Sequence, residues 1–222
     1  MRWLSDRRSI SITILVGLVV VGALFMRGVI LRPQYFEGPW VYGPTKARWT
    51  ITEYADLECP FCKTYTPLLK TWVKEQKDVN LQWSHLPLEI HGPAARREAR
   101  QVECAGKLGG ADAFWQAVDQ AFARTHSNGQ GFEGQLELAG IDQQDLETCT
   151  KEDIKVAIHI DRQRQEATAA GINATPSMVV RDNETGRTIK LEGPADGVTL
   201  LSAIDLLAQL AKLPPQGKAP PY

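Results

Sequence analysis

The spacing of apolar residues predicts a strand, a helix and a second strand in succession near residue 50 of this chain. Residues 49–56 and 79–86 are short runs rich in β-branched and aromatic side chains, and both predict strands. Residues 63–77, which lie between them, carry apolar side chains at helical spacing and predict a helix. A strand–helix–strand succession is typical of α/β folds.

After the second strand the apolar spacing becomes helical over a long stretch. The helices predicted there are, in chain order, residues 94–107, 112–124, 135–139, 142–149 and 152–170. Residues 177–181 and 188–192 then have strand composition and flank a turn sequence, which predicts a hairpin. A last helix is predicted from Asp196 or Gly197 to about residue 213, and the proline-rich tail, residues 214–222, is predicted to be disordered.

The first 46 residues have a different pattern. Three arginines among the first eight residues precede an uncharged, mostly apolar run that continues past Arg27, long enough for one transmembrane helix if the Arg27 side chain reaches the headgroups. We predict a cytoplasmic tail at residues 1–8, a transmembrane signal-anchor at residues 9–31 and a linker at residues 32–46, where Pro and Gly recur and aromatic residues could pack on the domain.

Two other interpretations of the N-terminus stay open. Residues 21–23 resemble the small-residue cleavage site of a signal peptide, which would leave a soluble exported domain. The apolar run could also be a buried core helix. Under both membrane interpretations, the basic flank at the N-terminus predicts that the bulk of the chain is exported.

Composition narrows the class of protein further. The chain has 222 residues, a mass of 24.6 kDa and 43% hydrophobic residues, which suits one large domain or one domain with an insertion. A formal net charge of −1 gives no reason to expect nucleic acid or an anionic substrate. An even number of cysteines is compatible with an oxidising compartment. Cys104 and Cys149, both in the helical stretch, are a candidate structural disulfide, with two free buried thiols as the alternative.

The other two cysteines form the motif Cys59-Pro60-Phe61-Cys62 at the junction between the first predicted strand and the first predicted helix. Unpaired backbone N–H groups and the positive end of the helix dipole converge there and favour a thiolate. We expect Cys59 to be the exposed nucleophile that forms a mixed disulfide, and Cys62 to be the more buried resolving thiol. A structural disulfide or half of a zinc site are the alternatives, although the sequence contains no second CxxC to complete a zinc site.

The alternation of side chains along the first predicted strand draws attention to one carboxylate, that of Glu53. Trp49, Ile51, Glu53 and Ala55 share one face, so Glu53 falls on an otherwise apolar row. A buried acid there would have a raised pKa and could exchange a proton with Cys62, whereas a strand-end Glu that reaches water is the alternative. Other charged residues are predicted to lie at the surface or at helix caps. These are Glu58, the basic face of Arg96, Arg97 and Arg100, and the four histidines His85, His91, His126 and His159.

Several of these features together resemble the DsbA-like thiol–disulfide oxidoreductases. They are Glu53 six residues before Cys59, Pro67 five residues after Cys62, the sequence Ala174-Thr175-Pro176 before the hairpin, and the stretches Glu103-Cys104-Ala105 and Ala113-Phe114-Trp115. The resemblance extends over residues 49–213. It implies an α/β thioredoxin fold with an inserted all-helical subdomain, here preceded by a single N-terminal transmembrane helix. The thioredoxin-fold domain would comprise residues 47–92 and 172–213, and the helical insertion residues 93–171.

The resemblance also implies roles for individual residues. Pro176 would be a cis-proline opposite the CxxC motif, so that the backbone of Thr175 turns toward Cys59 and pairs with an extended substrate. Glu53 would relay a proton to or from Cys62. No cofactor and no metal is implied.

The function that follows is a disulfide oxidase that donates the Cys59–Cys62 disulfide to reduced, folding exported proteins. Its expected partners are those substrates and a DsbB-like, quinone-linked membrane oxidase, with the protein in the bacterial inner membrane and its catalytic domain in the periplasm. A reductase or isomerase of the same fold is an alternative, because Phe61 stands where the best-known oxidases carry histidine. A non-catalytic thioredoxin-fold assembly factor is a third hypothesis, which the intact CxxC motif disfavours.

Overall fold

The computed structural model of the protein describes residues 35–212. The predicted cytoplasmic tail, signal-anchor and C-terminal tail lie outside these residues, as does the first part of the predicted linker. Within residues 35–212 there is no helix with both the length and the apolar character needed to cross a bilayer.

A five-stranded mixed sheet lies at the centre, with the order β1-β3-β2-β4-β5. Its strands are β1 (Val41–Tyr42), β2 (Trp49–Ala55), β3 (Val79–His85), β4 (Ser177–Asp182) and β5 (Thr188–Glu192). Strands β2 and β3 are parallel and every other pairing is antiparallel. The central strands carry buried aliphatic side chains because helices cover the sheet, and Ile51, Leu81 and Val180 are each 0% exposed.

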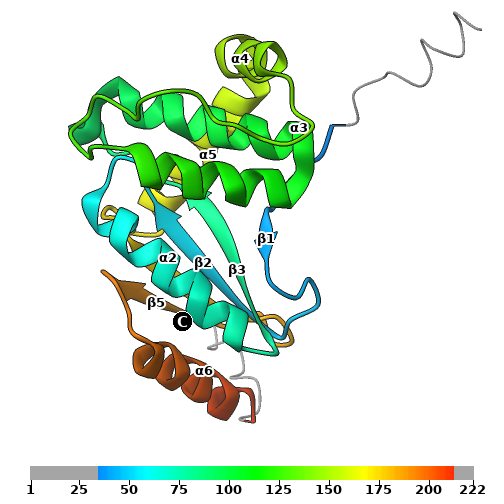
Figure 1. Ribbon diagram of the computed structural model, residues 1–222. Helices are drawn as coiled ribbons and strands as arrows, with labels where there is room; N and C mark the ends of the chain where they lie inside the picture. Colours follow the sequence, from blue (N-terminus) through cyan, green and yellow to red (C-terminus); the bar gives the residue numbers. More distant parts are fainter. Residues whose placement is uncertain (1–34, 213–222) are drawn as a thin grey trace, which may run out of the picture. The chain divides into compact units, whose positions relative to one another are not determined.

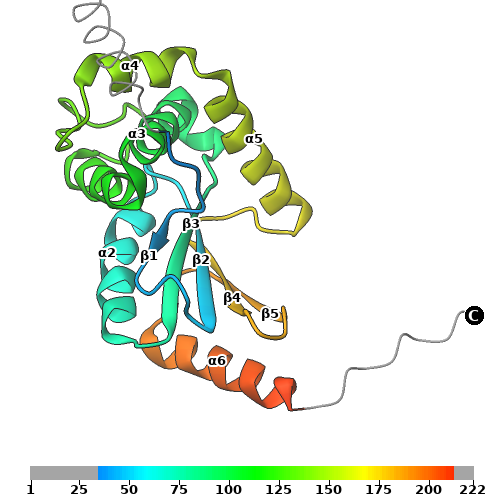
Figure 2. The same cartoon turned by 90° about the vertical axis from the view of Figure 1, so that its right-hand side faces the viewer.

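The helices fall into two groups (Figures 1 and 2). Helices α2 (Pro60–Glu75) and α6 (Gly197–Ala211) pack against the sheet. The short η1 (Glu89–His91) leads into a helical block, which is formed by α3 (Gly92–Arg124), α4 (Gln143–Glu152) and α5 (Ile154–Ala169). This block lies beyond the carboxyl ends of β2 and β3 in both views. The fold is therefore a thioredoxin fold with a helical insertion, as the sequence predicted.

Aromatic side chains join the insertion to the sheet. The ring centroids of Trp83 on β3 and of Phe114, Trp115 and Phe122 on α3 are 6.1–6.2 Å apart, most at steep interplanar angles. All four residues are at most 4% exposed. The insertion and the sheet thus share one hydrophobic core.

The predicted linker is part of the domain where the structure describes it. Strand β1 pairs with β3, and Trp40 is 5% exposed. Trp40 packs against α3 at Gly106, where a Cβ atom would come within 2.6 Å of Trp40 Cε2. The indole also donates a 2.9 Å hydrogen bond to Glu103. From Trp40 onward the predicted linker is therefore part of the packed domain, in line with the expectation that its aromatic residues could pack there.

The prediction of a helix at residues 135–139 is wrong. This segment is an extended loop in which Leu136 and Leu138 are buried and Glu137 exchanges backbone hydrogen bonds with the Gln120 side chain. A two-residue spacing of apolar side chains suits an extended chain on a core better than a helix. The two helices predicted on either side of Gly109 and Gly110 are joined as α3, which is kinked at Gly110, where φ is 77°.

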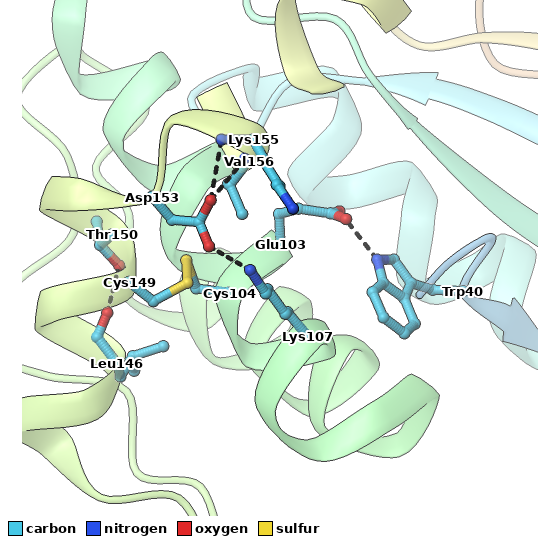
Figure 3. The surroundings of a disulfide bond; sticks show 10 residues. All are labelled: Trp40, Glu103, Cys104, Lys107, Leu146, Cys149, Thr150, Asp153, Lys155 and Val156. Carbon is cyan, nitrogen blue, oxygen red and sulfur yellow. Dashed lines mark hydrogen bonds and ion pairs between the residues drawn. A yellow bond between two sulfur atoms is a disulfide. The ribbon is translucent and has the colours of Figure 1, made fainter. Parts of the chain in front are cut away.

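A disulfide bond joins Cys104 on α3 to Cys149 on α4 (Figure 3). Cys104 is fully buried, and the two cysteines are 45 residues apart. Next to the bond, Asp153 caps the N-terminus of α5 and is paired with Lys107 of α3. The covalent bond and this ion pair both hold α3 against the later helices of the insertion.

Removing the disulfide should lower the stability of the domain. The variant Cys104→Ala/Cys149→Ala should lose about 2–4 kcal/mol of unfolding free energy in urea denaturation, because the unfolded chain is no longer cross-linked across 45 residues. Either single variant should cost nearly as much, since each already breaks the bond. Costs of the single variants that simply add up to that of the double variant would show that packing, not the cross-link, stabilises the insertion.

Candidate active site

The CxxC motif occupies the N-terminus of α2. Cys59 is the N-cap residue, Pro60 is the first helical residue, and the Cys59 N–H donates a 3.1 Å hydrogen bond to the Asp56 carbonyl. Both cysteines are unbonded. Cys59 is only 3% exposed, so the prediction of an exposed nucleophile is wrong in that respect: the segment before β4 packs over its sulfur. The neighbouring Phe61 is 65% exposed.

The environment of Cys59 favours its thiolate. A hydrogen bond from the Cys62 thiol is the largest influence that lowers the pKa of Cys59, which falls from 9.0 to about 6 although burial opposes the shift. The Thr175 hydroxyl and the backbone N–H groups of Cys62 and Phe61 lower it further. At neutral pH the reduced protein therefore holds Cys59 mainly as the nucleophilic thiolate.

Cys62 lies deeper and has the opposite character. It is 0% exposed, and burial raises the pKa of its thiol, as do the hydrogen bond to Cys59 and the charge of Glu53. One turn of helix thus separates an ionised sulfur at the start of α2 from a protonated one deeper in the core. This asymmetry suits an exchange in which the outer sulfur attacks first and the inner one resolves.

The segment before β4 closes the site on the other side. The peptide bond between Thr175 and Pro176 is cis, and the Thr175 carbonyl oxygen lies 3.4 Å from Cys59 Sγ. The Thr175 hydroxyl oxygen is shielded from solvent. Within the described part of the chain, the Cys59 thiolate is the group that this hydroxyl stabilises. The fold therefore brings Thr175 and Pro176 to the CxxC motif from more than 110 residues away in the sequence.

Glu53 is completely buried on β2. The Thr66 hydroxyl donates a 2.7 Å hydrogen bond to its Oε1 atom, and its Oε2 atom has no partner among the described residues. Burial raises the pKa of Glu53 to about 8, against the opposing influence of Thr66. Because Glu53 also raises the pKa of Cys62, the two groups are coupled through charge.

Comparisons with known proteins agree with this geometry. Residues 36–196 match the family model described as Thioredoxin. The chain is 55% identical to DsbA2 from Pseudomonas aeruginosa, whose crystal structure superposes with a TM-score of 0.75 over 78% of this chain and 96% of that one. The chain belongs to the DsbA-type thiol–disulfide oxidoreductases of the thioredoxin family. BdbD from Bacillus subtilis, at 21% identity and a TM-score of 0.59, shares the fold over 79% of this chain and 96% of that one.

Curated relatives of this oxidoreductase are much longer proteins. The Na(+)/H(+) antiporter NhaA 1 of Mycolicibacterium gilvum is 29% identical over 79% of this chain but only 28% of its own length. For NhaA 1 of Salinispora arenicola the identity is 28%, over 72% of this chain and 24% of that protein. The chain spans about a quarter of the length of these relatives.

The oxidoreductase also holds a buried acidic residue directly before the nucleophile. Glu58 was predicted to be exposed, but it is 0% exposed because the insertion covers it. Its two oxygens accept hydrogen bonds of 2.5 Å from the Thr125 hydroxyl and the Gly129 N–H, in the loop that follows α3. Lys63 donates to the Thr125 carbonyl. The active-site turn and this loop are thus fastened together.

Asp56 completes the same turn. It accepts from the Glu58 N–H at 2.9 Å, from the Leu88 N–H at 2.7 Å and pairs with His91 Nδ1 at 2.7 Å. Sequence reasoning missed this cluster, because only the fold brings residues 56–58, 88–91 and 125–129 together. The sole hint was the presence of two acids immediately before a CxxC motif.

His85 also differs from its prediction as a surface or capping residue, since it is 1% exposed. The Trp83 indole donates a 2.9 Å hydrogen bond to His85 Nδ1, so the imidazole proton lies on Nε2. That atom faces Glu103 Oε2 at 3.4 Å. His85 therefore serves the packing between sheet and insertion rather than the redox site.

Loss of the Glu58 contacts should loosen the loop after α3. Glu58→Ala should lower the unfolding free energy by about 3 kcal/mol, because it leaves the buried Thr125 hydroxyl and the half-buried Gly129 N–H without their charged acceptor. Glu58→Gln is the matched control, since its amide can bond both groups, and it should cost about 1 kcal/mol. Hydrogen exchange of residues 125–132 should be faster only in the alanine variant; equal exchange in both variants would contradict the role of Glu58.

Proposed function

We propose that this protein is an exported disulfide oxidase that transfers the Cys59–Cys62 disulfide to reduced polypeptides. The observation that carries the proposal is the stabilised thiolate of Cys59. An oxidant needs a stable reduced form, and a pKa of about 6 instead of 9.0 stabilises the dithiol at pH 7 by about 1.4 kcal/mol, equivalent to about 30 mV. The remainder of an oxidising potential would have to come from strain or packing in the disulfide form.

Export to an oxidising compartment is supported by two features. The Cys104–Cys149 disulfide is of a kind that persists outside the cytosol. The N-terminal arginines and the apolar run of residues 9–31 favour a single-pass inner-membrane protein with a cytoplasmic tail at residues 1–8 and a periplasmic catalytic domain. A soluble periplasmic form after cleavage is the alternative, and N-terminal sequencing of the cellular protein distinguishes the two.

The reaction also requires a partner. A substrate thiolate attacks the enzyme disulfide, a second substrate thiolate displaces Cys59 from the mixed disulfide, and the substrate leaves oxidised by two electrons. The enzyme dithiol must then pass two electrons and two protons to an acceptor. We propose a DsbB-like, quinone-linked membrane oxidase for this step, and reduced or unfolded exported proteins as substrates.

A reductase or isomerase is the second candidate function. It is favoured by Phe61, whose side chain offers no hydrogen bond to the Cys59 thiolate from within the CxxC motif.

Equilibration of the full chain with glutathione separates the two functions. A reduction potential above about −200 mV supports the oxidase, whereas a value near that of thioredoxin, about −270 mV, supports the reductase. Thiol trapping in cells gives the matching result, mainly oxidised Cys59–Cys62 for an oxidase and mainly reduced for a reductase.

A further inference from the structure

We propose that the helical insertion carries a second binding site, a cationic pocket for an acidic segment of the polypeptide that exchanges disulfides at Cys59. A cavity of about 450 Å³ opens between the first half of α3, the loop before α4, and α4 itself. Its wall includes Arg96, Arg97, Arg100 and Lys151, over a floor that includes Leu136 and Leu146. The proposal depends on thiol–disulfide exchange in either direction, not on the oxidase function.

The arginines on this wall are poorly compensated. Arg96 and Arg100 are one turn apart on α3, where like charges repel and destabilise the helix. Arg96 is paired with Glu89, and Lys151 with Glu147, which also lines the cavity. Within residues 35–212, neither Arg97 nor Arg100 has a carboxylate at ion-pair distance. The sequence predicted that Arg96, Arg97 and Arg100 form a helix face that is only solvated. Solvation alone does not require these three side chains to line one cavity.

The lack of compensating partners is clearest at Arg100. Its Nε atom is shielded from solvent and has no hydrogen-bond partner in the described part of the chain, a state that costs free energy. Arg97 donates one hydrogen bond, to the Gln130 carbonyl at 3.2 Å. The adjacent Glu98 does not neutralise these charges, because burial and the nearby Glu58 raise the pKa of its carboxyl to about 8.

The chemistry of the pocket selects its ligand. Guanidinium groups bind carboxylates through two parallel hydrogen bonds, and the leucine floor accepts the aliphatic part of an acidic or neighbouring apolar side chain. A cavity of this volume is of the size that accommodates a small ligand or a few side chains. We therefore assign it to a short stretch of Asp or Glu residues in a polypeptide.

Its position connects the pocket to the redox site. Pro93 lines the cavity two residues after His91, and His91 binds Asp56 in the turn before Cys59. Arg96 to Arg100 lie five to nine residues beyond His91, about 8–14 Å along a helix. An extended substrate covers that length with about three or four residues. The stretch from Cys59 across Asp56 to His91 adds to this length, so the acidic segment would lie several residues further along a polypeptide held at Cys59.

Two peptide substrates test the pocket directly. They contain the same disulfide-forming cysteine pair and differ only in a segment, several residues from the cysteines, that is either Asp/Glu or Asn/Gln. With the full chain, the acidic peptide should have the lower KM. Arg97→Gln and Arg100→Gln should each raise the KM of the acidic peptide about tenfold, as expected for a lost hydrogen bond to a charged group. The difference in KM between the two peptides should shrink accordingly.

Arg181→Gln is the matched control. Arg181 is an exposed residue of β4, so this substitution removes the same charge at a place away from the pocket. It should leave both KM values unchanged. Arg100→Lys keeps the charge without the planar fork and should lie between the wild type and Arg100→Gln; should Arg100→Gln unfold, the exposed Arg97 decides alone. Equal KM values for the two peptides in the wild type, or an equal effect of Arg181→Gln, would overturn the proposal. Turnover of the Asn/Gln peptide reports disulfide exchange by itself, so failure of the pocket and failure of the redox function are distinguishable.

Discussion

Cys62→Ser should convert the enzyme into a trap for its substrates. When the reduced enzyme attacks a substrate disulfide, Cys59 forms a mixed disulfide, and a second enzyme thiol beneath it releases the reduced substrate by attacking the Cys59 sulfur. Cys62 is the residue in that position, since it is 0% exposed and donates to the Cys59 thiolate. Without it, multiple turnover should fall by about 1,000-fold or more. Mass spectrometry under non-reducing conditions should detect a covalent complex at Cys59.

Cys59→Ser provides the comparison. It should lose turnover to the same extent but accumulate no complex, because the remaining Cys62 is buried and its thiol stays protonated at neutral pH. Substantial turnover by Cys62→Ser, or a complex formed through Cys62 in the Cys59→Ser variant, would contradict the assigned order of attack.

Glu53→Gln should make the protein more stable and less active. The folded state raises the pKa of Glu53 from 4.5 to about 8, so the unfolded state binds fewer protons between these values. Wild-type stability is therefore greatest below pH 4.5 with respect to this group, falls as pH rises toward 8, and then levels off. Glutamine removes that dependence and can keep the Thr66 hydrogen bond. At pH 7 the gain should approach an upper limit of about 3 kcal/mol, measured as unfolding free energy across pH.

The same variant should slow exchange. We propose that Glu53 relays a proton to or from Cys62, and loss of a general acid–base group costs on the order of 100-fold in rate. Glu98→Gln is a matched control, because Glu98 is also buried with a pKa raised to about 8, but lies outside the redox site. It should gain stability and keep its exchange rate. A Glu53→Gln enzyme with wild-type exchange would exclude the proton relay.

Local patterns were sufficient to predict much of the fold. Alternation along residues 49–55 places Glu53 on the buried face, and the strand-to-helix junction places Cys59 at the start of α2. Both follow from the period of the backbone, which acts over a few residues. The hairpin of β4 and β5 was predictable for the same reason.

Features made by distant segments were not predictable. Glu58 looks like a surface acid until Thr125 and Gly129 are brought against it, and His85 is buried only because the insertion covers β3. Likewise, residues 135–139 are too short for the two-residue spacing of Leu136 and Leu138 to decide between strand and helix, and the core that these side chains enter fixes the extended form. In each case tertiary packing decided the burial, and one sequence contains no record of its tertiary neighbours.

The most direct test of the account is a titration of Cys59 in the reduced full chain. The rate of alkylation by iodoacetamide, followed at Cys59 against pH, should rise with a midpoint of about 6. Because Cys62 stays protonated, a single transition should be seen below pH 8. A midpoint near the ordinary value of 9.0 would contradict a stabilised thiolate, and with it the oxidase that we propose.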